Sequence, residues 1–269
     1  MKKKLSNLAQ VKAKKSLGQH FLFDEHLCQE IVASSALISN KVVVEVGPGH
    51  GSLTDAILSK NPKQLFLIEK DAELISSLHR KYQHHSHVKI IEQDALKCNL
   101  ASLTDQPIII IANLPYNAGT QMLCNWLVHN CKQLDHLTLM FQKEVIDRIC
   151  AVPGCKDYGR LSVLCQSLAQ CSKSFDVEAR HFTPPPKVTS AIVQIQPIQP
   201  TLPVELVQAL EKVTASAFSC RRKILKTNLK NLFSAQELIA LGALPTQRAE
   251  ELNIDTFLRL ANALTQKTT

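Results

Sequence analysis

The chain has 269 residues, and its 45% hydrophobic and 20% charged residues are ordinary values for a globular protein. This composition excludes a disordered chain, a coiled coil and a collagenous repeat, and the length predicts one or two domains. The 31 Lys and Arg residues outnumber the 23 Asp and Glu residues, giving a net charge of +8. Such a charge favours a polyanionic partner.

Nine cysteines are present, but none has the C-x-x-C spacing of a zinc site, and the amino-terminal stretch lacks the apolar core of a signal peptide. We therefore expect reduced cysteines, no metal and a cytoplasmic location. The longest uncharged stretch, residues 106–131, is long enough to span a bilayer. Polar residues interrupt it, so we interpret it as a strand, a loop and a helix, and expect no membrane segment.

From about residue 41, short apolar runs alternate with helical patterns. We expect strands at 41–46, 64–68, 88–91, 108–111 and 136–140, and helices at 52–60 and 72–82. Near-continuous apolar strands separated by helices indicate a parallel sheet covered on both faces. Right-handed crossovers then give a doubly wound α/β fold.

The remainder of the chain has a different pattern. Two runs, 173–179 and 188–195, flank a proline-rich loop, and we interpret them as an antiparallel hairpin that closes one edge of the sheet. After a proline-punctuated linker, helical periodicity recurs at 204–217, 223–233 and 255–264. The sequence thus predicts two domains, residues 1–198 and a small all-helical domain at 199–269.

Three of the eight glycines, Gly47, Gly49 and Gly51, directly follow the first strand. Glycine lets the backbone turn tightly and lets a ligand approach the main chain, although a plain strand-to-helix turn would explain an isolated G-x-G equally well. Glu69 ends the second strand, where dinucleotide-binding proteins use a carboxylate to accept the ribose hydroxyls. These positions favour a nucleotide-like ligand.

Glu45 lies on the strand before this loop, where a dinucleotide site has an apolar residue. A carboxylate there would repel a pyrophosphate and attract a cation, so S-adenosylmethionine fits better than NAD. Asp94, after the third strand, could accept a hydrogen from an adenine amino group, although alone it is more simply a turn-capping residue. Together with the loop and Glu69, it favours a ligand site at the carboxyl edge of the sheet.

Asn113, Leu114, Pro115 and Tyr116 follow the fourth strand. Asn and Pro are common in turns, but this set also suits methyl transfer to an adenine amino nitrogen, whose lone pair is delocalised into the ring. The Asn113 side-chain oxygen and the Leu114 carbonyl could hold both amino hydrogens and direct the lone pair at a methyl donor. Pro115 would stiffen the loop, and Tyr116 would stack on a flipped-out base.

These motifs, in this order, resemble those of the ribosomal RNA adenine dimethyltransferases, and among them the bacterial enzymes of small-subunit (16S) rRNA. The matching segments are 15–22, 46–54, 68–71, 93–95, 113–116, 182–190 and 217–225. The resemblance implies a class I S-adenosylmethionine-dependent methyltransferase that adds two methyl groups to each of two adjacent adenosines near the 3′ end of 16S rRNA. Carried over by position, it implies a cofactor site of His20, Leu22, Gly47, Gly49, Glu69, Asp94, Ala95 and Asn113.

Two clusters of basic residues contain no acid: residues 1–15 hold six lysines, and residues 212–236 hold six Lys and Arg residues. A like-charged run is often only a solvated face, but two such clusters flanking a base-modifying domain favour contact with an RNA backbone. Arg222 and Lys226, four apart, would lie on one helical face. We expect RNA contacts from Phe182, Lys187, Arg221, Arg222, Lys223 and Lys226.

Other functions remain open on this evidence. A sister enzyme that methylates large-subunit rRNA would share the donor site, although the segment 182–190 and the basic cluster at 221–223 argue against it. A non-catalytic ribosome-assembly or transcription factor would not need Asn113, Pro115 and Tyr116 intact. A small-molecule or DNA methyltransferase would not explain the helical domain. We expect a monomer whose partner is 16S rRNA within the small subunit or its precursor, with a role in subunit biogenesis.

Overall fold

The computed structural model describes residues 19–268, so the amino-terminal lysines and the first residues of the segment 15–22 lie outside the described part. The chain divides into two compact units. Within the described residues, the first unit comprises 19–126, 132–146 and 172–196, and the second comprises 127–131, 147–171 and 197–268. The last segment of the second unit begins at residue 197, next to the predicted boundary, but the unit also includes two earlier segments. A helix within 147–171 packs against the carboxy-terminal helices.

The first unit is built on a seven-stranded sheet with the order β4-β3-β2-β5-β6-β9-β7. The parallel strands are β2 (Val42–Val46), β3 (Gln64–Glu69), β4 (Val88–Glu92), β5 (Ile108–Asn113) and β6 (Leu134–Gln142). The predicted strands are thus confirmed, and so is the closing edge: β9 (Ser190–Pro197) runs antiparallel to β6, and β7 (Ala169–Val177) lies outside it.

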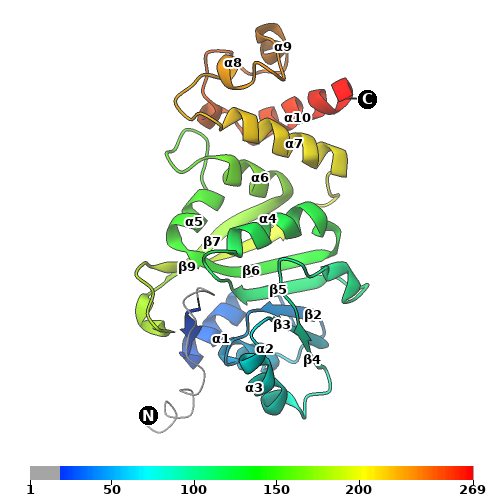
Figure 1. Cartoon of the computed structure of the whole chain (residues 1–269), viewed down its shortest axis with the longest axis vertical. Helices are drawn as coiled ribbons and strands as arrows, with labels where there is room; N and C mark the ends of the chain where they lie inside the picture. The colour runs from blue at the N-terminus through cyan, green and yellow to red at the C-terminus, as the bar shows by residue number, and fades with distance from the viewer. Residues whose placement is uncertain (1–18, 269) are drawn as a thin grey trace. The chain divides into compact units, whose positions relative to one another are not determined.

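Helices cover this sheet and bury its branched residues. The helices α1 (Glu25–Ser34), α2 (Ser52–Leu58) and α3 (Ala72–Tyr82) lie close to β2 and β3 (Figure 1). Val43 and Ile109 share one core cluster with Ile31 of α1 and Ile57 of α2. Burial of each such side chain stabilises the fold by roughly 1.5–3 kcal/mol. This packing holds the strand ends in register. The helix α4 (Gly119–His129) follows the loop after β5, as predicted.

A short second sheet joins distant parts of the first unit. β1 (Phe21–Leu22) pairs antiparallel with β8 (Phe182–Thr183), so Leu22 lies opposite Phe182. Both side chains are buried in the same core cluster as α1. The segment with His20 is therefore placed beside the late segment 182–190, a pairing that the sequence patterns do not predict.

The second unit is helical. Its longer helices are α6 (Arg160–Leu168), α7 (Val204–Ala217) and α10 (Ile254–Thr268), and α6 and α10 both pack against α7. The predicted helix 223–233 is wrong, since only α8 (Leu225–Asn228) forms there, and α9 (Ala235–Ala240) follows it. Residues 221–223 lie in turns before α8, so Arg222 and Lys226 do not share a helical face.

Two further expectations concern the chain as a whole. All nine cysteines are free, and Cys220 is exposed while the others are buried or half-buried. None of the helices between residues 19 and 268 is long and apolar enough to cross a membrane.

Candidate active site

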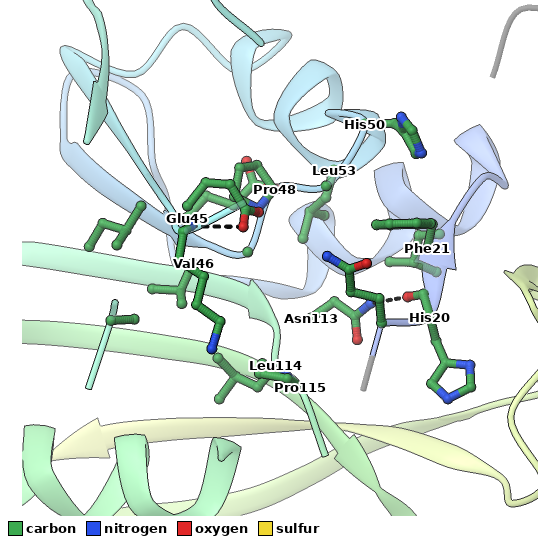
Figure 2. Close-up of a pocket in the computed structure, with 18 of the residues that line it drawn as sticks. His20, Phe21, Glu45, Val46, Pro48, His50, Leu53, Asn113, Leu114 and Pro115 are labelled. Atoms are coloured by element: carbon green, nitrogen blue, oxygen red, sulfur yellow. Dashed lines mark hydrogen bonds between the residues drawn. The ribbon is translucent and has the colours of Figure 1, made fainter. Parts of the chain in front are cut away.

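A cavity opens at the carboxyl edge of the parallel strands (Figure 2). The glycine loop after β2 and the ends of β3, β4 and β5 line it, as parallel α/β sheets predict. β1 adds a wall that the sequence patterns do not predict, with Phe21 next to the glycine loop. Every residue predicted for cofactor binding or catalysis lines this cavity: His20, Leu22, Gly47, Gly49, Glu69, Asp94, Ala95, Asn113, Leu114, Pro115 and Tyr116.

The glycine loop adopts a backbone that favours glycine. Gly47, Gly49 and Gly51 have φ of +67°, +57° and +81°, the left-handed region. A Cβ on Gly49 would lie 2.8 Å from the Cδ1 atom of Phe21, so a side chain there would displace that ring. At Gly47 the nearest atom would be 3.9 Å away, which leaves room for a ligand to approach the main chain.

Glu45 lies on β2 beneath this loop and is only 1% exposed. The Thr54 hydroxyl donates a 2.6 Å hydrogen bond to its Oε2 atom. Burial raises the pKa of Glu45 to about 8, so the neutral acid is favoured at neutral pH. The sequence suggests that Glu45 attracts a cationic ligand, which requires the carboxylate form. A positive charge on a bound ligand would itself favour that form.

Glu69 is 7% exposed at the end of β3. Its Oε1 atom accepts hydrogen bonds from the N–H groups of Lys70 at 2.8 Å and Asp71 at 3.0 Å. Burial raises the pKa of Glu69, and these amide bonds, with one from Gly49, oppose the rise. A carboxylate has about four lone-pair sites, so this geometry orients Glu69 and leaves acceptor capacity for a ligand hydroxyl.

Asp94 has the turn-capping role considered for it, and its geometry is compatible with the ligand role. Its Oδ1 atom accepts a 3.0 Å hydrogen bond from the Leu96 N–H, so it caps the turn after β4. Its Oδ2 atom is 3.9 Å from Lys70 Nζ, and both residues line the cavity. The second oxygen can therefore still accept a hydrogen from a ligand.

Asn113 ends β5, in register with Met140 of β6. Its Nδ2 atom donates a 3.0 Å hydrogen bond to the backbone carbonyl of His20, and Figure 2 shows the two residues facing each other. This bond uses the donor end of the amide and turns the oxygen, the acceptor end, away from His20. An amide oriented in this way can hold an amino hydrogen of a substrate.

Tyr116 is half-buried at the other end of the tetrapeptide. Its hydroxyl lies 2.6 Å from the Ser190 Oγ atom, and its ring stacks on His20 with centroids 5.4 Å apart and planes at 30°. Burial raises the pKa of Tyr116, so the phenol stays protonated. Ser190 had no signal in the sequence beyond its place in the segment 182–190.

The residues predicted to contact RNA differ in their surroundings. Phe182 is only 2% exposed, so its side chain is not available to RNA, contrary to the prediction. Lys187, Arg222, Lys223 and Lys226 are exposed. Arg221 is exposed too, but its side chain bonds Glu250 at 2.8 Å and the carbonyls of Lys156 and Tyr158, all within the second unit. Among the described residues, no three His, Cys, Asp or Glu side chains are grouped to hold a metal ion.

The chain is similar to known proteins over nearly its whole length. A family model described as ribosomal RNA adenine dimethylase matches residues 10–266. The chain is 45% identical over 255 residues to a "Ribosomal RNA small subunit methyltransferase A" from Sinorhizobium medicae, covering 94% of this chain and 93% of that protein. A protein of the same name from Rhodospirillum rubrum is 44% identical over 257 residues, with 94% and 88% covered.

Two solved structures share the fold. A dimethyladenosine transferase from Plasmodium falciparum has a TM-score of 0.80 at 23% identity, covering 93% of this chain and 98% of that chain. The 23S rRNA methyltransferase ErmE has a TM-score of 0.69 at 23% identity, with 91% and 99% covered. These likenesses confirm the predicted Rossmann-like methyltransferase fold. Since the family model spans nearly the whole chain and these relatives match 94% of it, the chain belongs to the ribosomal RNA adenine dimethylase family and is an rRNA adenine methyltransferase.

Proposed function

We propose that this chain uses S-adenosylmethionine to dimethylate the 6-amino groups of two adjacent adenosines near the 3′ end of 16S rRNA, in four methyl transfers. The observation that carries the proposal is the Asn113 amide, which lines the cavity and whose nitrogen donates to the His20 carbonyl, so that its oxygen is the end left to accept a hydrogen bond. The names of the curated relatives support the small subunit as the target. A monomer that acts in the cytoplasm during subunit biogenesis is part of the proposal.

The residues of the cavity fit the methyl donor. Glu69 retains acceptor capacity for ribose hydroxyls, Asp94 retains one oxygen for an adenine amino group, and Gly47 leaves the main chain open to approach. Glu45 is buried, which favours its neutral form, and the positive charge of a bound donor would favour its carboxylate form. When bound, the donor supplies an electrophilic methyl group on a sulfonium.

On the acceptor side, the chain acts by positioning. The Asn113 oxygen and the Leu114 carbonyl would hold the two amino hydrogens, which reduces delocalisation of the nitrogen lone pair into the ring and directs it at the methyl donor. Tyr116 would stack on the flipped-out base, an interaction of roughly 1–3 kcal/mol. The proton leaves after the nitrogen has become cationic, so no side chain needs to act as a base before attack.

Contacts with the rRNA backbone are proposed for the exposed basic residues Lys187, Arg222, Lys223 and Lys226. Of these, all but Lys187 lie in the second unit, which supports an RNA-binding role for the helical region. Arg221 is already bonded within that unit, so it is the weaker candidate.

In the test, the protein is incubated with tritiated donor and with immature small subunits, large subunits and duplex DNA as competing acceptors. We expect label in small subunits, recovered as dimethyladenosine after digestion. At saturating donor, Asn113→Ala should lose about 100-fold in rate, the scale for one preorganised electrostatic contact. Asn262→Ala, a change at an exposed helical asparagine, is the control. Label chiefly in large subunits would redirect the proposal to 23S rRNA, and normal turnover by Asn113→Ala would refute the mechanism.

A further inference from the structure

The late segment 182–190 was predicted to contact RNA through Phe182, but Phe182 is buried in the core. We propose instead that this segment is a brace that fixes the acceptor loop Asn113–Tyr116, with Ser190 and His20 as positioning residues for the target adenine. The proposal rests on the proposed function for its target and adds a role for residues outside the tetrapeptide.

Ser190 holds one end of the loop. It begins β9, lies in register opposite Gln142 of β6, and is 0% exposed, so its own position is set by the sheet. Its hydroxyl is 2.6 Å from the hydroxyl of Tyr116. A bond at the hydroxyl restrains χ1, because rotation about χ1 would carry the hydroxyl away from Ser190. Rotation about χ2 turns the ring about an axis through the hydroxyl, and it is the stacked ring of His20 that restrains this rotation. The ring is therefore held as a stacking platform before a base arrives.

His20 holds the other end. Its Nδ1 atom lies 2.7 Å from the Pro184 carbonyl, and since a carbonyl only accepts, Nδ1 must carry the hydrogen. Its ring stacks on Tyr116, and its backbone carbonyl accepts a hydrogen bond from the side-chain amide of Asn113. One residue thus contacts both functional side chains of the loop, and its ring is oriented by the late segment.

The brace is itself anchored by β1 and β8. Phe21 lies opposite Thr183 and Leu22 opposite Phe182, and both Leu22 and Phe182 are buried in the core. This pairing places His20 and Pro184, 164 positions apart in the chain, within hydrogen-bond distance. Burial of Phe182 is therefore the reason the brace is rigid.

The proposal predicts an effect on methyl transfer without an effect on donor binding. Glu69 and Asp94, two of the residues assigned to the donor, lie at the ends of other strands and have their own backbone bonds. His20 and Asn113, also assigned to the donor, keep their side chains in the variants compared below. If the hydroxyl pair only added stability, its removal would lower the melting temperature but leave the rate at saturating donor unchanged. The rate and the donor affinity therefore separate the two roles.

The experiment compares Ser190→Ala, Tyr116→Phe and the double variant in single-turnover methyl transfer at saturating donor. Each single variant should lose roughly 3- to 10-fold in rate, the effect of one neutral hydrogen bond, and the double variant should be no slower than the slower single variant. Ser167→Ala is the matched control, because Ser167 is 5% exposed and its hydroxyl has no partner among the described residues. Donor affinity by calorimetry should be unchanged in all four variants, the control included.

A second readout does not need activity. The chain has three tyrosines, so ring-labelled tyrosine gives three sets of NMR signals, and Tyr116→Phe identifies one of them. Ser190→Ala should shift and broaden the Tyr116 signals and leave those of Tyr82 and Tyr158 in place. An unmoved Tyr116 signal, a wild-type rate in Ser190→Ala, or multiplied losses in the double variant would each overturn the brace. Failure of the wild type to methylate small subunits would instead overturn the proposed function.

Discussion

Tyr82 holds the glycine loop from outside the cavity, and removal of its hydroxyl should weaken both the fold and the donor site. Tyr82 ends α3 and is 5% exposed. Its hydroxyl lies 2.9 Å from the Gly51 carbonyl and 2.8 Å from Asp55 Oδ1. A Cβ on Gly51 would collide with this hydroxyl, so the loop and the tyrosine are fitted closely.

The size of the effect follows from what Tyr82→Phe leaves behind. One O–H donor is lost, and a hydrogen bond to a charged group contributes about 1.5–3 kcal/mol. Lys81 Nζ still contacts Gly51 O at 3.2 Å and Asp55 Oδ2 at 2.7 Å, and the ring remains in place. We therefore expect a loss near the lower end, about 1–2 kcal/mol, which corresponds to a melting-temperature decrease of about 2–8 °C.

The assay is thermal unfolding together with calorimetric donor binding, and the matched control is Tyr158→Phe. Tyr158 is 0% exposed, and its hydroxyl has no hydrogen-bond partner within residues 19–268. Loss of an unsatisfied buried hydroxyl should be neutral or stabilising. We expect donor affinity to fall in Tyr82→Phe alone, by at most about tenfold, since 1.4 kcal/mol is tenfold. Equal destabilisation of the two variants would refute the reasoning, and unchanged donor affinity would show that Gly51 is not held for binding.

Three more predictions concern charged residues. Glu69→Ala should weaken donor binding by about 1.5–3 kcal/mol and leave RNA binding unchanged; calorimetry with unaltered donor affinity would remove Glu69 from the site. Glu45 has its folded-state pKa raised to about 8 from 4.5, so stability should fall as pH rises from 4.5 through 8. Glu45→Gln should flatten this part of the profile, and urea midpoints with the same pH dependence in both proteins would contradict it. Arg222→Ala with Lys226→Ala should reduce the salt dependence of subunit binding by roughly one unit or less per phosphate contact; an unchanged slope would mark a solvated face.

The sheet and the cavity were predictable because local patterns determine them. A run such as Ile108–Ile111 is too apolar for an exposed position and too β-branched for a preferred helix, so it predicts a buried strand. The helix 72–82 was predicted with its observed bounds because its apolar residues recur on one face, and Asp71 caps its start. Once the strands are parallel, their carboxyl ends meet at one edge, so Glu69, Asp94 and Asn113 must gather there.

The misses have a common physical origin in contacts between distant segments. The residues of the predicted helix 223–233 include Leu225 and Leu229, four apart and both buried, which suggests helical periodicity. However, the Leu225 N–H donates to the Gln247 carbonyl and the Lys226 N–H to Pro245. These are the first amides of α8, which have no partner within the helix itself, so a loop about twenty residues later fixes where the helix begins. The pairing of β1 with β8 was missed for the same reason.

Arg221 shows why the charge of a segment does not identify a phosphate contact. The stretch 212–236 contains no acid, and Arg221 was predicted to contact RNA together with Arg222, Lys223 and Lys226. In the structure, Glu250 lies 2.8 Å from Arg221, and the guanidinium also reaches the carbonyls of Lys156 and Tyr158. Because that acid comes from a distant loop, an inspection of neighbouring residues cannot detect it. A guanidinium that binds RNA would have to give up its bonds to two carbonyls and a carboxylate. Within residues 19–268, the side chains of Arg222, Lys223 and Lys226 show no such bonds, so these residues are the better candidates for contact with the RNA backbone.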